Sequence, residues 1–90
     1  MSDDLDPTGP ATTAVVAVIG GTGPQGKGLG YRFARGGHTV VLGSRSADKA
    51  GPVADEVTAR LVDVPGAGAV SGAANPDAVA QADVVVLAVP

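Results

Sequence analysis

Apolar residues follow two patterns along this chain, and the alternation of these patterns predicts the fold. Residues 14–19 and 83–89 are almost continuously apolar, and residues 38–42 are apolar at their centre. An apolar run without polar alternation is typical of a strand that is covered on both faces, as in a parallel sheet. Between these runs apolar residues recur at helical spacing. The chain is therefore expected to alternate strands with helices.

The first predicted helix covers about 24–36. Pro24 suits its first turn, where the missing N–H is not needed, and Gly36 begins a stop signal. Leu29 and Phe33 are four residues apart and are expected to face the sheet. Three glycines lie inside this helix: Gly26, Gly28 and Gly30. Each should cost about 1 kcal/mol relative to alanine, which we expect close packing against a strand or a ligand to offset.

The second predicted helix follows Ser46, a candidate N-cap. Its expected buried stripe consists of three apolar residues spaced four apart: Val53, Val57 and Leu61. Gly51-Pro52 lies too deep for a first-turn proline if the helix begins at residue 47. Two alternatives follow. Either the helix bends at this point, or a short turn precedes a helix that starts near Pro52.

A loop at 65–68 and a short strand at about 69–71 complete the pattern before a small helix through Gln81. Asn75 is predicted to be the N-cap of this helix, with Pro76 in its first turn. The resulting order is βαβαβαβ. Because crossovers between parallel strands are almost always right-handed, this order predicts an α/β fold, a Rossmann-like doubly wound parallel sheet. The expected strand order is 3-2-1-4, with a ligand at the switch between the first and fourth strands.

The predicted domain is incomplete. With 90 residues there is room for little more than one half of a complete doubly wound fold. We expect residues 14–90 to form a Rossmann domain that lacks its C-terminal part, and residues 1–13 to be a disordered leader. The fourth strand would be a bare apolar edge, which soluble proteins avoid. We therefore expect a further C-terminal segment or a second copy, in a homo-oligomer, to cover it.

Composition excludes several classes of function. Without cysteine and with His38 as the single histidine, the chain offers neither thiolate nor multi-histidine metal ligands. The N-terminus does not resemble a secretory signal, and no apolar run approaches the length of a membrane span, so a cytoplasmic protein is expected. A net charge of −3 argues against nucleic-acid binding.

The positive charge is concentrated in one region. Five of the six basic residues lie between positions 27 and 49, where Asp48 is the single acid, giving that region +4 and the rest of the chain −7. Arg32 and Arg35 are explained as the solvent-facing side of a helix. Arg45 and Lys49 remain as candidates to bind an anionic ligand.

The residues after the first strand carry the clearest chemistry. Gly21, Gly23 and Gly26 have the G-x-G-x-x-G spacing of a dinucleotide-binding loop between a strand and a helix. Gly21 permits the tight turn, Gly23 admits the pyrophosphate to backbone N–H groups, and Gly26 lets the helix approach the sheet. The helix N-terminus adds partial positive charge.

The end of the second strand indicates which dinucleotide. Enzymes that prefer NAD place an acid there for the ribose 2′-hydroxyl, whereas this chain has Ser44-Arg45. An arginine pairs with a phosphate and a serine donates to it, so the predicted ligand is NADP(H). Lys49 and Thr22 are expected to add a charge and a hydroxyl.

No catalytic residue is predicted. Asp83, His38 and Tyr31 are each explained by a structural position, and no nucleophile–base pair is visible. Direct hydride transfer between two bound cofactors would not require one.

The combination of these motifs resembles one family. The residues of this chain that carry the resemblance are the loop from Gly20 to Leu29, Gly37-His38, the segment Val41–Arg45 and the ending Ala82–Pro90. Together they are similar to the NADPH-dependent F420 reductases, also called F420H2:NADP oxidoreductases. The resemblance implies hydride transfer between NADP(H) and the deazaflavin coenzyme F420.

The resemblance also implies roles for individual residues. Those matching Thr22, Gly23, Pro24 and Gln25 would hold the pyrophosphate region, and those matching Ser44, Arg45 and Lys49 the 2′-phosphate. Those matching Ala88 and Val89 would border the cofactor. The chain departs from the family at Gly51-Pro52, in a helix that is usually unbroken, and in lacking the stretch that would shape the F420 cleft.

Two other functions remain open. The chain could be a catalytically silent NADP(H)-binding module, such as a redox-sensing domain like the NmrA-type regulators, although its A-V-P ending speaks against these. It could also be the front end of another NADPH-dependent reductase, such as the cytosolic part of a membrane ferric reductase.

Overall fold

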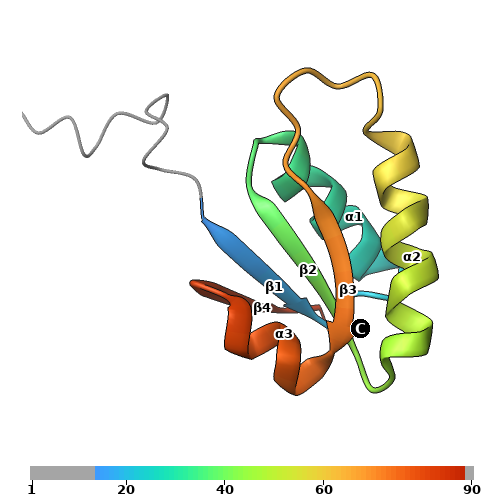
Figure 1. The fold of residues 1–90 in the computed structure, drawn as a ribbon, viewed down its shortest axis with the longest axis vertical. Helices are drawn as coiled ribbons and strands as arrows, with labels where there is room; N and C mark the ends of the chain where they lie inside the picture. The colour runs from blue at the N-terminus through green and yellow to red at the C-terminus, as the bar shows by residue number, and fades with distance from the viewer. Residues whose placement is uncertain (1–13, 89–90) are drawn as a thin grey trace, which may run out of the picture.

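A four-stranded parallel sheet forms the centre of the molecule (Figure 1). The computed structural model describes residues 14–88, so the predicted leader at 1–13 lies outside the described residues. The strands are β1 (Val15–Ile19), β2 (Thr39–Ser44), β3 (Val70–Ala74) and β4 (Val84–Leu87). Their order is β3-β2-β1-β4, and every pairing is parallel. The predicted fold class and strand order are confirmed.

Helices cover both faces of the sheet (Figure 1). The helices are α1 (Pro24–Arg35), α2 (Ala47–Arg60) and α3 (Asn75–Gln81). Helices α1 and α2 share one face, whereas α3 covers the other. Alternate side chains of β1 serve the two layers: Val16 and Val18 pack with α1 and α2, and Ala17 packs with Ala78 of α3. The expectation that β1 is covered on both faces is confirmed.

Close backbone packing of α1 explains two of its three internal glycines. The buried stripe of this helix is Gly26, Gly30 and Ala34, while the predicted inward pair, Leu29 and Phe33, is only partly buried beside it. A Cβ atom at Gly26 would lie 2.4 Å from the Cα of Gly21, and one at Gly30 would lie 2.8 Å from Leu42 Cδ2. These contacts bring the helix axis close to the sheet. Gly28 meets nothing within 4 Å, so packing does not explain it.

Helix α2 is continuous through its proline. It starts at Ala47, capped by the Ser46 hydroxyl, which accepts a hydrogen bond from the Asp48 N–H at 3.2 Å. The alternative of a helix starting near Pro52 is therefore wrong. Pro52 lies on the exposed side of the helix, opposite the buried Ala50, so water can bond to the carbonyl that the proline leaves without an amide donor.

Three predicted boundaries need correction. Strand β2 continues to Ser44 and β3 to Ala74 because the two strands pair in register to their ends, Ser44 opposite Ala74. As a result Asn75 is the first residue of α3 and not its N-cap, a position that Ala74 takes. The side chain of Asn75 is thereby left without a capping role.

Strand β4 is an edge strand, as predicted. Within residues 14–88 it pairs with β1 alone, and Val84, Val85 and Leu87 remain 47%, 45% and 66% exposed. Because these side chains alternate between the two faces of the sheet, apolar surface is exposed on both sides of β4.

Candidate functional site

The carboxyl ends of the four strands meet at one edge of the sheet. Gly20 follows β1, Ser44 ends β2, Asn75 follows β3 and Ala88 follows β4. In an open α/β sheet, ligands bind at this edge, where the strand order reverses. Here the reversal lies at β1, between β2 and β4.

The loop after β1 is fixed to both neighbouring strands by its backbone. The Gly21 N–H donates to the Gly43 carbonyl at 3.0 Å, and the Ala88 N–H donates to the Ile19 carbonyl at 2.9 Å. Gly20 has φ +77°, and a Cβ atom there would lie 3.0 Å from the Ala88 carbonyl oxygen. Only glycine adopts this conformation readily, so the loop can pass directly over the end of β4.

The N-terminus of α1 carries no capping side chain. Gly23 is its N-cap and makes no side-chain hydrogen bond, and the first turn contains no acidic residue. Pro24 has no N–H, and the amides of Gln25 and Gly26 precede the first intrahelical donor, the Lys27 N–H, which bonds to the Gly23 carbonyl at 2.9 Å. These free amides and the helix dipole favour an anion at this point.

A cleft of ≈ 250 Å³ lies beside this helix end. Its lining consists of Gly20, Thr22, Ser44, Arg45, Ser46, Lys49 and Asn75. The cleft thus brings together four residues that the sequence placed in one anion site: Thr22, Ser44, Arg45 and Lys49. Ser44 is only 6% exposed, and its hydroxyl accepts a hydrogen bond from the Ser46 N–H at 3.4 Å.

The basic side chains between residues 27 and 49 have different roles, since one forms an ion pair between helices and two line the cleft. Within residues 14–88 the one ion pair joins Lys27 Nζ to Glu56 Oε2 at 3.2 Å, so Lys27 links α1 to α2. Arg45 and Lys49 have no carboxylate partner in that range and line the cleft. A guanidinium, an ammonium, hydroxyls and free amides form a donor set that suits phosphate oxygens.

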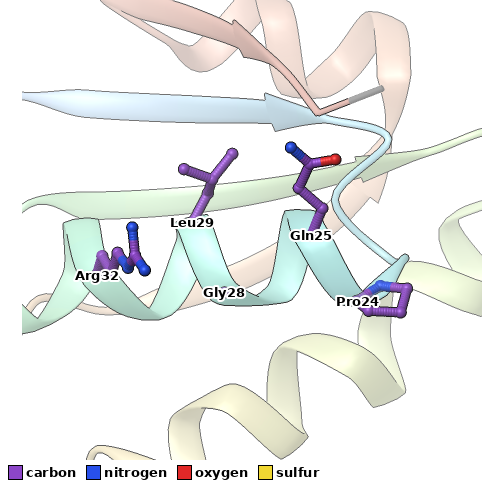
Figure 2. A pocket seen from close by; sticks show the side chains of 5 residues that line it. All are labelled: Pro24, Gln25, Gly28, Leu29 and Arg32. Carbon is purple, nitrogen blue, oxygen red and sulfur yellow. The ribbon is translucent and has the colours of Figure 1, made fainter. Parts of the chain in front are cut away.

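Other predicted site residues lie beside the cleft. Pro24 and Gln25 line a second groove of ≈ 370 Å³ along α1, together with Gly28, Leu29 and Arg32. In Figure 2, Gln25 and Leu29 point from the helix toward the strands. Gly21 and Gly26 are buried against each other and contribute backbone only. Val89 lies outside the described residues.

Residues 15–90 match the protein family described as NADP oxidoreductase, coenzyme F420-dependent. The chain belongs to this family. Three relatives are named F420-dependent NADP reductase. That of Methanothermobacter thermautotrophicus is 53% identical over 77 residues, 83% of this chain and 32% of the relative. That of Methanothermobacter marburgensis is 44% identical over 77 residues, 83% of this chain and 33% of the relative.

The third relative, from Methanocaldococcus jannaschii, is 36% identical over 75 residues, 83% of this chain and 33% of its own length. The chain therefore spans about a third of the length of the curated relatives it matches.

Sequence reasoning missed Asn75 as a lining residue of this family member's cleft. Its polar side chain was assigned to a helix cap, although its place directly after a strand puts it at the ligand edge of the sheet. Ser46 was predicted as a cap, which it is, but its position in the cleft was also missed. The available signal was topological: polar residues that follow parallel strands gather at one edge.

No helix in residues 14–88 combines the length and the apolar character needed to cross a bilayer.

Proposed function

We propose that this chain is the NADP(H)-binding part of an oxidoreductase that transfers hydride between NADP(H) and coenzyme F420. The observation that carries the proposal is the cleft that joins Thr22 of the glycine loop to Ser44, Arg45 and Lys49. Family membership and the name shared by the three relatives support the same activity.

In this proposal the residues of the cleft hold the two anionic parts of the coenzyme. The free amides at the start of α1, with Gly23 and the Thr22 hydroxyl, bind the pyrophosphate. Arg45 and Lys49 bind the 2′-phosphate as cations, and the Ser44 hydroxyl donates to it. Because an acid is absent from this position, the cleft offers no acceptor that would favour the free 2′-hydroxyl of NAD(H).

The reactive end of the coenzyme lies at the end of β4 in this proposal. Ala88 packs against Gly20, so a dinucleotide whose pyrophosphate rests on the loop extends from there across the carboxyl end of β4. When bound, the nicotinamide supplies the hydride chemistry. The described residues bind and orient it, and none is needed as acid or base for transfer between two cofactors.

We further propose that a segment beyond this part of the protein, or a second copy, forms the F420 site and covers β4. The exposed apolar side chains of β4 support this, because an uncovered edge strand exposes both pairing groups and apolar surface. The relatives, about three times as long as the matched region, have the length for such a segment. We also propose a cytoplasmic location, because the cleft must bind dissolved NADPH.

Calorimetric titration of the chain with NADPH and with NADH tests the nucleotide assignment. We expect NADPH to bind more tightly, by about 10-fold or more, because charged hydrogen bonds to the 2′-phosphate contribute about 1.5–3 kcal/mol. Equal affinity for the two coenzymes would contradict the role given to Ser44, Arg45 and Lys49.

The hydride-transfer activity requires a separate assay on the full-length protein that contains this chain. We expect NADPH to reduce F420. The reaction is monitored under anaerobic conditions as a loss of F420 absorbance. Tight NADPH binding without turnover of F420 would instead support the silent binding module. Turnover with another acceptor would support the front end of a different reductase.

A further inference from the structure

Asn75 has a buried polar atom without a partner. Its Oδ1 atom is inaccessible to solvent and accepts no hydrogen bond from residues 14–88. Leaving a buried acceptor unpaired costs about 1–3 kcal/mol, so native proteins rarely keep one without a function. Because Ala74 is the N-cap of α3, capping does not explain the side chain. Asn75 also lines the cleft, so a half-turn of its carboxamide about the Cβ–Cγ bond brings the oxygen to the one place where a ligand can bond to it.

The position of this amide depends on a glycine in β2. A Cβ atom at Gly43 would lie 2.7 Å from Asn75 Oδ1 and 3.0 Å from Ile19 Cδ1. Because Gly43 has no side chain, the carboxamide of Asn75 can occupy this space. Gly43 and Ile19 are paired across β2 and β1, so the amide lies over the junction of these two strands.

That junction lies between the two anion-binding parts of the cleft. The loop beginning at Gly20 follows β1, and Ser44 and Arg45 follow Gly43 in β2. In a dinucleotide with a 2′-phosphate, the adenosine ribose connects the pyrophosphate to that phosphate. A ligand held by both parts of the cleft therefore places its ribose next to Asn75.

We propose that the Asn75 carboxamide hydrogen-bonds to the adenosine ribose of the coenzyme. This inference rests on the proposed function, since it assumes that a dinucleotide fills the cleft. A carboxamide both donates and accepts, and a ribose hydroxyl does the same, so the ribose completes the bonding of a side chain that the protein leaves unpaired. The contact is common to NADPH and NADH, unlike the contacts of Arg45.

Titration of Asn75→Ala with NADPH and NADH tests the proposal. We expect both affinities to fall by about 5- to 30-fold, as for one lost hydrogen bond to a ligand, with their ratio unchanged. Gln81→Ala is the matched control, because it removes a carboxamide from the same helix at an exposed position, where among the described residues it bonds to the Asp77 carbonyl alone. This control should bind both coenzymes like the wild-type chain.

A second measurement uses the wild-type chain and does not depend on the folding of a variant. The side-chain amide resonances of Asn75 should shift in ¹⁵N–¹H spectra when either coenzyme is added, and those of Gln81 should not. Unchanged affinities in Asn75→Ala, or an unmoved Asn75 amide, would overturn the proposal. A loss of affinity for NADPH but not for NADH would also overturn the proposal, because it would show that the Asn75 amide contacts the 2′-phosphate and not the ribose. A wild-type chain that binds neither coenzyme would contradict the proposed function itself.

Discussion

In the proposed function, the choice of coenzyme depends most on Arg45. It is exposed, has no carboxylate partner within residues 14–88 and lines the cleft beside Ser44. We predict that Arg45→Asp weakens NADPH binding by about 1.5–3 kcal/mol and NADH binding far less, because it replaces a charged hydrogen bond to the 2′-phosphate with repulsion. Calorimetry with both coenzymes measures the difference.

Arg35→Asp is the control for this prediction, since Arg35 is also exposed but lies in the last turn of α1, away from the cleft. It makes the same change in net charge. An equal loss of NADPH affinity in both variants would show that overall charge, and not the position of Arg45, determines binding.

Gly26 and Gly28 lie two residues apart in α1 and are expected to respond oppositely to alanine. At Gly26 the new Cβ atom would lie 2.4 Å from Gly21 Cα, so Gly26→Ala should destabilise the fold by about 1–3 kcal/mol and displace the loop. At Gly28 nothing lies within 4 Å, so Gly28→Ala should stabilise it by about 0.4–1 kcal/mol. Urea denaturation of both variants checks the pair, and a similar stability for the two would contradict the packing argument.

At this scale the sequence identified the residues with a recognisable local spacing. The glycine loop and Ser44-Arg45 could be found because both motifs lie within a few positions of one strand end. Asn75 and Gly43 could not be paired in this way, since 32 positions separate them and parallel strand pairing alone brings them together. Local spacing contains no information about that contact.

At the scale of the element, helix α2 retains a proline that its packing does not require. Pro52 is exposed, and the carbonyl one turn earlier lacks its amide donor. We predict that Pro52→Ala stabilises the chain by about 1–3 kcal/mol, which a thermal melt followed by circular dichroism can measure. Pro76→Ala is the control, because Pro76 lies in the first turn of α3, where its change should be small. A lower melting temperature for Pro52→Ala would mean that the proline stabilises the chain.

The types and order of the seven elements in residues 14–88 could be predicted from apolar runs for β1, β2 and β4 and from helix start signals for α1, α2 and α3, while the short β3 followed from the loop before it and the helix after it. The boundaries of these elements were harder to predict. Strand β2 passes through Gly43, a residue disfavoured in strands, since β1 and β3 pair with it from both sides. The continuity of α2 through Pro52 also depends on tertiary packing, because Ala50 and Ala54 bury the opposite face.

At the scale of the whole molecule, we expect β4 to promote self-association of the chain. Its exposed apolar side chains and unpaired edge favour strand addition by another copy. We predict that the apparent mass from light scattering rises with concentration and that Leu87→Lys suppresses the rise. Val62→Lys is the control, since Val62 is 79% exposed but lies outside the sheet. Equal suppression by both variants would indicate general solubility and not an edge contact.

The contact between Gly20 and the end of β4 has a consequence for how coenzyme preference can evolve. The loop rests on main-chain atoms of Ala88. In the proposed function, this fixed backbone contact would set the distance between the phosphates and the reactive ring of the coenzyme. The groups that we propose distinguish the two coenzymes line the cleft elsewhere, at residues 44–49. If this proposal holds, substitutions at residues 44–49 would change the coenzyme preference and leave the alignment for hydride transfer unchanged.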